Sequence, residues 1–259
     1  MSNNNNYATS DEFMEFMRKN WEKIKPYRFE WVYATLAGWD KVEFERLYNE
    51  YVKSTQITLG PGDDATELKG RPLEKISRYF LEKGGIVTGI REISEPQKWQ
   101  VDGQGLLNKT AIYEVWGEDI CRKIGFQLYM EAKNHSVAVT NDEFSVHVRR
   151  MVEHDCYCGV LISTSGYKIG RGKGIAESIH RQYWQNRFHL LLVFQSLREI
   201  AVDDKPPLAV LTKTLGYAVN NNYVNDAEIQ RLYSAESCRK AASAEFQRLF
   251  GTQIEDKTS

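Results

Sequence analysis

Two short apolar runs constrain the fold of this chain more than any other feature of its sequence. They cover residues 157–163 and 189–194, and each is almost continuous in hydrophobic residues. Strands that are covered on both faces have this pattern, so the second run predicts a strand that is buried and central in its sheet. Between the two runs, Ile175, Ile179 and Tyr183 recur at a spacing of four, which predicts a helix. An α/β fold is therefore expected.

The residues before these runs predict a helix followed by several strands. Pro72 suits the first turn of a helix. Leu73, Ile76 and Phe80 then form an apolar stripe, and a glycine pair ends the helix. Strands are expected after it at residues 86–93, 98–107, 111–116 and 124–133.

Another helix is expected to begin at Thr140. Thr140 and Glu143 have the spacing of a capping box, in which each residue satisfies a backbone N–H at the helix start. The buried stripe of this helix is predicted to consist of Phe144, Val148, Met151 and Val152. The order of elements is therefore helix, several strands, helix, strand, helix and strand, in a mixed central sheet flanked by helices.

Helical regions are expected on both sides of this unit. Apolar and aromatic residues recur at helical spacing between residues 10 and 51, and a turn-rich stretch at 59–64 forms a boundary. The chain is helical again after residues 206–207, ending in a long segment from about 225 to 250. We therefore expect a helical N-terminal region (1–60), a core (61–200) and a helical C-terminal region that packs on the core (201–259).

Composition excludes several classes of protein. Lys and Arg number 34 against 35 Asp and Glu, so any attraction for nucleic acid must be local. Apolar runs are too short for a membrane span, and the first residues lack the basic and apolar parts of a signal peptide. The four cysteines have no disulfide-framework spacing, and a reduced, cytoplasmic protein is expected.

Three residues on two expected strands form the candidate catalytic group. Glu131 and Lys133 are two apart on a strand, so they share a face and can address one ion and one phosphate. Asp102 lies on the polar face of an earlier strand. The two carboxylates, with the backbone carbonyl of Ala132, would form a hard oxygen site for Mg²⁺ or Mn²⁺. Glu74 could support the metal, although a glutamate in a first helical turn is favourable whatever its function.

Phosphodiester hydrolysis needs a site of this kind. The attacking water must lose a proton, and negative charge builds on the phosphate in the transition state. A divalent ion assists both changes, and Lys133 can orient the water or stabilise the phosphate oxygens.

With Asp102 followed by Glu131-x-Lys133 in an α-β-β-β-α-β order, the chain resembles the PD-(D/E)xK nuclease superfamily. Residues 159–167 and the strand around 190–193 are similar to its Mrr-like, restriction-endonuclease branch. The resemblance covers roughly residues 70 to 198. It implies a restriction-endonuclease-like core, a Mg²⁺-dependent endonuclease acting on DNA in restriction or phage defence, a homodimer and an additional defence-system subunit.

The sequence departs from this family at three points. No proline precedes Asp102, and Mrr-like proteins often have Gln where this chain has Glu131. The long interval between these two residues implies an inserted pair of strands.

A glycine-rich basic segment follows the first apolar run. Lys168, Arg171, Lys173 and, on the next helix, Arg181 are candidate nucleic-acid contacts, because a flexible loop before a helix offers cations and N–H groups to phosphates. A solvated connector explains the segment equally well. The spacing of His154, Cys156 and Cys158 does not suit a zinc site, and a core or surface role is favoured for them.

Three other functions stay open at this point. The same fold could be a non-catalytic nucleic-acid-binding or assembly module. It could also be a nuclease for RNA or branched DNA, or a scaffold without affinity for metal or nucleic acid.

Overall fold

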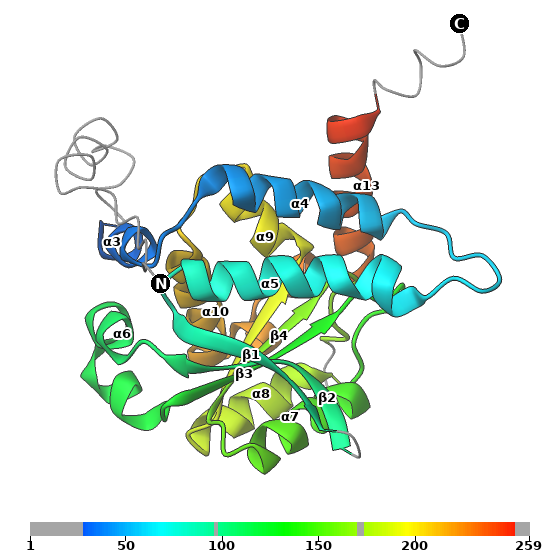
Figure 1. Cartoon of the computed structure of the whole chain (residues 1–259). Coiled ribbons are helices and arrows are strands. Elements are labelled where there is room, and N and C mark those ends of the chain that lie inside the picture. Colours follow the sequence, from blue (N-terminus) through cyan, green and yellow to red (C-terminus); the bar gives the residue numbers. More distant parts are fainter. Residues whose placement is uncertain (1–27, 96–97, 170–173, 252–259) are drawn as a thin grey trace, which may run out of the picture.

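A five-stranded mixed sheet forms the centre of this computed structural model, and helices cover both of its faces (Figure 1). The structure describes residues 28–95, 98–169 and 174–251. In chain order the elements are α3 (Arg28–Leu36), α4 (Lys41–Thr55), η2 (Thr66–Gly70), α5 (Arg71–Lys83), β1 (Val87–Glu95), β2 (Lys98–Leu107), α6 (Lys109–Lys123), β3 (Gln127–Lys133), α7 (Asn141–Glu153), β4 (Cys158–Ser163), α8 (Ile175–Trp184), β5 (Phe188–Val193), α9 (Phe194–Ala201), α10 (Pro207–Val219), α11 (Asn222–Asn225), α12 (Ala227–Leu232) and α13 (Ala235–Phe250). The α/β class expected from the apolar runs is confirmed.

The strands lie in chain order across the sheet, from β1 to β5. β1, β2 and β3 form an antiparallel meander, whereas β3, β4 and β5 are parallel. Lys133, Ser163 and Val193 are in register at the carboxyl ends of the parallel strands. The chain segments that leave these three strands therefore meet at one edge of the sheet, the usual place for a ligand site in such folds.

Alternating side chains of the parallel strands feed two hydrophobic clusters. Val160 and Ile162 of β4 face a cluster that includes α4, α5, α9, α10 and α13, while Leu161 faces a second cluster that includes α7 and α8. Phe44 from the expected N-terminal region and Ala242 from the expected C-terminal region both belong to the first cluster. The described parts of the three expected regions thus share one core. Every helix in them is too short or too polar to span a bilayer.

The strand predicted at residues 111–116 is wrong, because these residues are helical and belong to α6. The Asn108 side chain caps this helix by accepting a hydrogen bond from the Ala111 N–H at 3.2 Å. Ala111 and Ile112 are fully buried, and Val115 and Trp116 pack on the same cluster at helical spacing. The insertion between β2 and β3 is therefore a helix and not a pair of strands.

Two further expectations need correction. β5 is buried as predicted, but it is the last strand of the sheet and not a central one; helices α8, α9 and α10 pack around it. The segment at 225–250 is divided into α12 and α13, because the Ser234 hydroxyl accepts the Ser237 N–H and starts a new helix.

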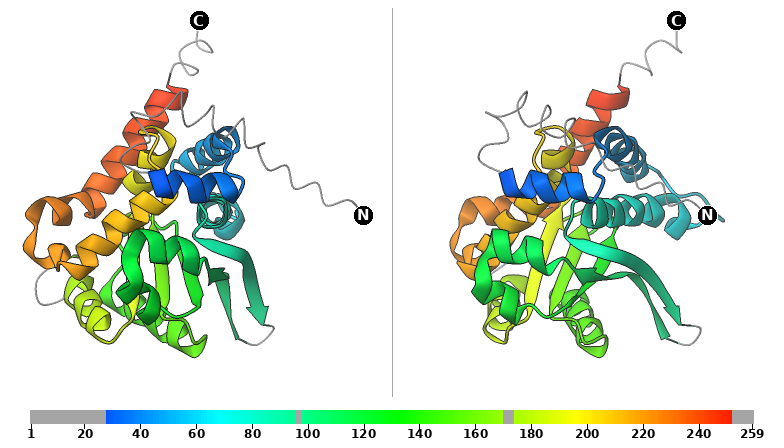
Figure 2. Two further views of the ribbon diagram at one scale, coloured as in Figure 1. Left: turned by 90° about the vertical axis from the view of Figure 1, so that its left-hand side faces the viewer. Right: turned by 60° about the vertical axis from the view of Figure 1, so that its left-hand side comes forward.

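β1 and β2 form an arm. Their far ends extend beyond the helical layers, as both views in Figure 2 show. The pairing of β2 with β3 runs from Gly103 to Leu106, and the part of β2 before Gly103 pairs with β1. Asp102 therefore lies where β2 leaves the main sheet.

Candidate active site

The candidate catalytic residues line one cavity of about 650 Å³. Asp102 comes from β2, Glu131 and Lys133 from the end of β3, and Glu74 from α5. The Ala132 N–H donates a hydrogen bond to Asp102 Oδ2 at 2.7 Å. The Asp102 carboxylate thus continues the β2–β3 ladder by one step and is held beside Glu131.

Three basic side chains surround the Glu131 carboxylate. Lys133 Nζ lies 2.6 Å and Arg150 Nη1 3.3 Å from Glu131 Oε1, and His147 Nδ1 lies 3.2 Å from Oε2. Glu131 is 3% exposed. Burial acts to raise its pKa, but hydrogen bonds and charge from His147 and Lys133 outweigh burial and lower the pKa to about 2. Glu131 is therefore held ionised and in a fixed orientation.

His147 and Arg150 were not singled out from the sequence. Both lie on α7, and His147 is almost completely buried in the stripe that also contains Phe144 and Met151. Val152, which was expected in that stripe, is 41% exposed. The available signal was a basic pair at the three-residue spacing of His147 and Arg150, inside an otherwise apolar helical face.

Asp102 has the opposite electrostatic environment. Burial, with smaller contributions from Glu74 and Glu131, raises the pKa of Asp102 to about 6, while the hydrogen bond from Ala132 and the charge of Lys133 act against this rise. The carboxylates on this side of the cavity repel one another. A bound cation would relieve that repulsion.

Glu74 and Arg78 connect α5 to the site. Glu74 is 7% exposed; burial raises its pKa, and Arg78, whose Nη2 is 3.7 Å from Glu74 Oε2, opposes the rise. Arg78 Nε also donates to the backbone oxygen of Asp102 at 2.7 Å, and its Nη2 to Glu92 at 3.1 Å. Arg78 therefore fixes the backbone of β2 at the point where Asp102 enters the cavity.

The donor set of the cavity suits a hard divalent cation. Asp102, Glu131 and Ala132 line the same space, and Mg²⁺ is commonly held by one or two carboxylates with water completing its shell. Within the described residues, no three His, Cys, Asp or Glu side chains form a ready-made metal cluster. A metal held here would therefore depend on water and backbone oxygen, and would share Glu131 with Lys133.

The predicted nucleic-acid contacts lie apart from this cavity. Lys168 is exposed after β4, and Arg181 is exposed on the last turn of α8, toward the opposite end of the parallel strands. Neither residue lines the cavity. Arg171 and Lys173 fall outside the described residues.

The pair Cys156 and Cys158 belongs to the core. Both are buried free thiols, and burial raises the pKa of Cys156 to about 12 and that of Cys158 further. Cys156 donates to the backbone oxygen of His154 at 3.4 Å. The sequence left a core and a surface role open for these residues, and the structure places both cysteines in the core.

No protein-family model, no curated protein and no solved structure matches this chain. Its function is therefore argued from the cavity itself.

Proposed function

We propose that this protein is a metal-dependent nuclease of the PD-(D/E)xK type that hydrolyses phosphodiester bonds in DNA. The observation that carries the proposal is the meeting of Asp102 on β2 with Glu131 and Lys133 on β3 in one cavity. The order α5-β1-β2-β3-α7-β4, interrupted by α6, supports a restriction-endonuclease-like core. For a nuclease of this type we propose a role in restriction or phage defence.

The carboxylates of Asp102 and Glu131, with the Ala132 carbonyl, would hold Mg²⁺ or Mn²⁺. When bound, the ion lowers the pKa of the attacking water and neutralises charge on the phosphate. Glu74 would support this cation through a water molecule. His147 and Arg150 keep Glu131 ionised and oriented, and Arg78 holds the β2 backbone. These three are positioning residues.

The position of Lys133 in the cavity supports a catalytic role for this residue. Its ammonium group lies 2.6 Å from Glu131 Oε1, and its side chain is 24% exposed and lines the cavity. From this position it would orient the attacking water or donate to a phosphate oxygen as negative charge builds there. Cleavage of both strands of a duplex needs two such sites, and we propose a homodimer for that reason.

One observation favours a second candidate function. Both oxygens of Glu131 already have basic partners within the chain, so this carboxylate is satisfied without a metal. A non-catalytic nucleic-acid-binding module on the same fold would have such a site.

Plasmid cleavage separates the two functions. Supercoiled DNA is incubated with the wild type in Mg²⁺, Mn²⁺ or EDTA, beside Lys133→Ala and the control Lys123→Ala, whose lysine is exposed and pairs with Asp119. We expect metal-dependent nicking that is retained in the control and falls roughly 10²- to 10³-fold in Lys133→Ala. Equal activity in both variants would refute the nuclease site. Inactivity of the wild type on plasmid, RNA and branched DNA would favour the binding module.

A further inference from the structure

A second, smaller cavity of about 260 Å³ lies beside the candidate active site. Its volume is below the roughly 300–1,000 Å³ of typical small-molecule pockets, so it suits a single small group. The residues that line both cavities are Lys69, Asn134, His135 and Ser136. The two cavities are therefore neighbours on either side of the segment that follows β3.

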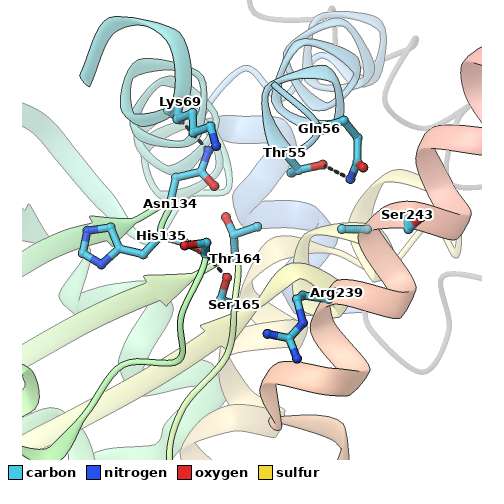
Figure 3. A pocket seen from close by; sticks show the side chains of 11 residues that line it. Thr55, Gln56, Lys69, Asn134, His135, Thr164, Ser165, Arg239 and Ser243 are labelled. Carbon is cyan, nitrogen blue, oxygen red and sulfur yellow. Dashed lines mark hydrogen bonds between the residues drawn. The ribbon is translucent and has the colours of Figure 1, made fainter. Parts of the chain in front are cut away.

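Five parts of the chain converge on this second cavity, as Figure 3 shows. The end of α4 contributes Thr55 and Gln56, the segment after β4 contributes Thr164 and Ser165, and α13 contributes Arg239. The segment after β3 and the end of η2 complete the wall. Residues distant in sequence thus form one polar recess.

The lining of the second cavity carries positive charge and no carboxylate. Lys69 and Arg239 both reach it, and within the described residues neither forms an ion pair with an acidic side chain inside 4.0 Å. The ring of His135 points away from the recess in Figure 3, and its Nδ1 lies 3.7 Å from Glu143 Oε1. Two basic residues therefore line a space to which no carboxylate contributes.

Hydrogen bonds hold the polar lining in place. Thr164 Oγ1 and the Tyr51 hydroxyl are 2.9 Å apart in a buried contact. Asn134 Nδ2 donates to Ser54 Oγ at 3.2 Å, and Ser165 Oγ donates to the backbone oxygen of His135. A recess whose walls are fixed in this way loses little conformational freedom when an anion enters.

We propose that this second cavity binds a phosphate group of the nucleic acid, one that neighbours the phosphodiester held in the candidate active site. The inference rests on the proposed function for the identity of its ligand. Arg239 would form paired hydrogen bonds to two phosphate oxygens, and Lys69 would supply a point charge from the wall that the cavities share. The polar side chains of the recess would complete the shell around the phosphate.

The test measures DNA binding apart from cleavage. Fluorescence anisotropy in EDTA gives the affinity of a short duplex, with either 5′-phosphate or 5′-hydroxyl ends, as a function of salt. Arg239→Ala and Lys69→Ala are compared with Lys240→Ala, which removes the same charge from the next position of α13, where Lys240 pairs with Glu236. We expect about ten-fold weaker binding for the two cavity variants. The slope of log affinity against log salt should also fall by about one.

The two duplexes distinguish the source of the phosphate. Equal weakening on both identifies an internal phosphodiester, and loss of a preference for the phosphorylated duplex identifies a terminal phosphate; each result supports the inference. Arg239→Ala with wild-type affinity and slope would overturn it, as would an equal effect of Lys240→Ala or the absence of binding by the wild type. Wild-type plasmid cleavage, measured in parallel, shows separately whether the nuclease proposal stands.

Discussion

The two neighbouring cavities differ in the charges that line them. The larger combines the carboxylates of Glu74, Asp102 and Glu131 with the basic side chains of Lys69, Lys133 and Arg150. The smaller is lined by Lys69 and Arg239 and by no carboxylate. The segment after β3 forms a wall of both. We propose a metal ion on one side of this wall and a phosphate group on the other.

The largest effect is expected from removing the charge of Glu131. Glu131→Gln should reduce metal-dependent cleavage roughly 10²- to 10³-fold, because it removes a metal ligand and the partner of Lys133. The measurement is the single-turnover rate across a Mg²⁺ series, with Lys240→Ala as the control. Arg239→Ala should leave the Mg²⁺ midpoint unchanged while DNA binding weakens. A shift of that midpoint in Arg239→Ala would contradict the division into two cavities.

A smaller effect is expected at Asp102, where removing the charge should raise the free energy of unfolding. Its pKa in the folded protein is about 6, above the ordinary 3.8. The folded state therefore binds the proton more tightly than the unfolded chain, and the free energy of unfolding falls as pH rises from about 4 to about 6. Solvent screening of this partly exposed group limits the loss to about 2 kcal/mol.

Asp102→Asn tests this prediction by urea unfolding without divalent metal. The variant should be about 2 kcal/mol more stable than the wild type at pH 8 and equal to it near pH 4. Mg²⁺ should then stabilise the wild type and not the variant. Equal pH profiles of the two proteins would show that the charge of Asp102 does not destabilise the folded state.

The smallest effect is expected on stability, at the hydrogen bond that holds Thr164 in the lining of the second cavity. Tyr51→Phe removes the buried hydrogen bond to Thr164 and should cost about 1 kcal/mol of unfolding free energy. The matched control is Tyr48→Phe on the same helix, since the buried Tyr48 hydroxyl has no hydrogen-bond partner within the described residues. Denaturant unfolding should show a loss for the first variant and none for the second. A loss of the same size in both would assign the effect to packing.

Local signals in the sequence predicted the elements that carry the candidate site. The glycine pair after Phe80 ends α5, and the capping box of Thr140 and Glu143 starts α7, as expected. What decides these two helix ends lies within a few residues along the chain. The pairing of β2 with β3 does not follow in this way, because a strand was expected between them where α6 lies.

Features that depend on distant partners escaped prediction. The apolar residues of α6 suit a strand or a helix, and only the Asn108 cap and the burial of Ile112 decide between them. A strand as nearly apolar as β5 has the same sequence whether strands or helices cover its edge. Arg78, His147 and Arg150 belong to helices, and their relation to the site arises only when those helices pack on the sheet.

The place of Asp102 at the root of the β1–β2 arm has a mechanical consequence. Gly103 is the first residue of β2 in register with β3, so Asp102 occupies the pivot between arm and sheet. Its side chain is tied to β3 through the Ala132 N–H, and its backbone to α5 through Arg78. These two ties fasten the base of the arm to the main sheet and to α5. The arm is therefore anchored to the rest of the molecule at the candidate site itself.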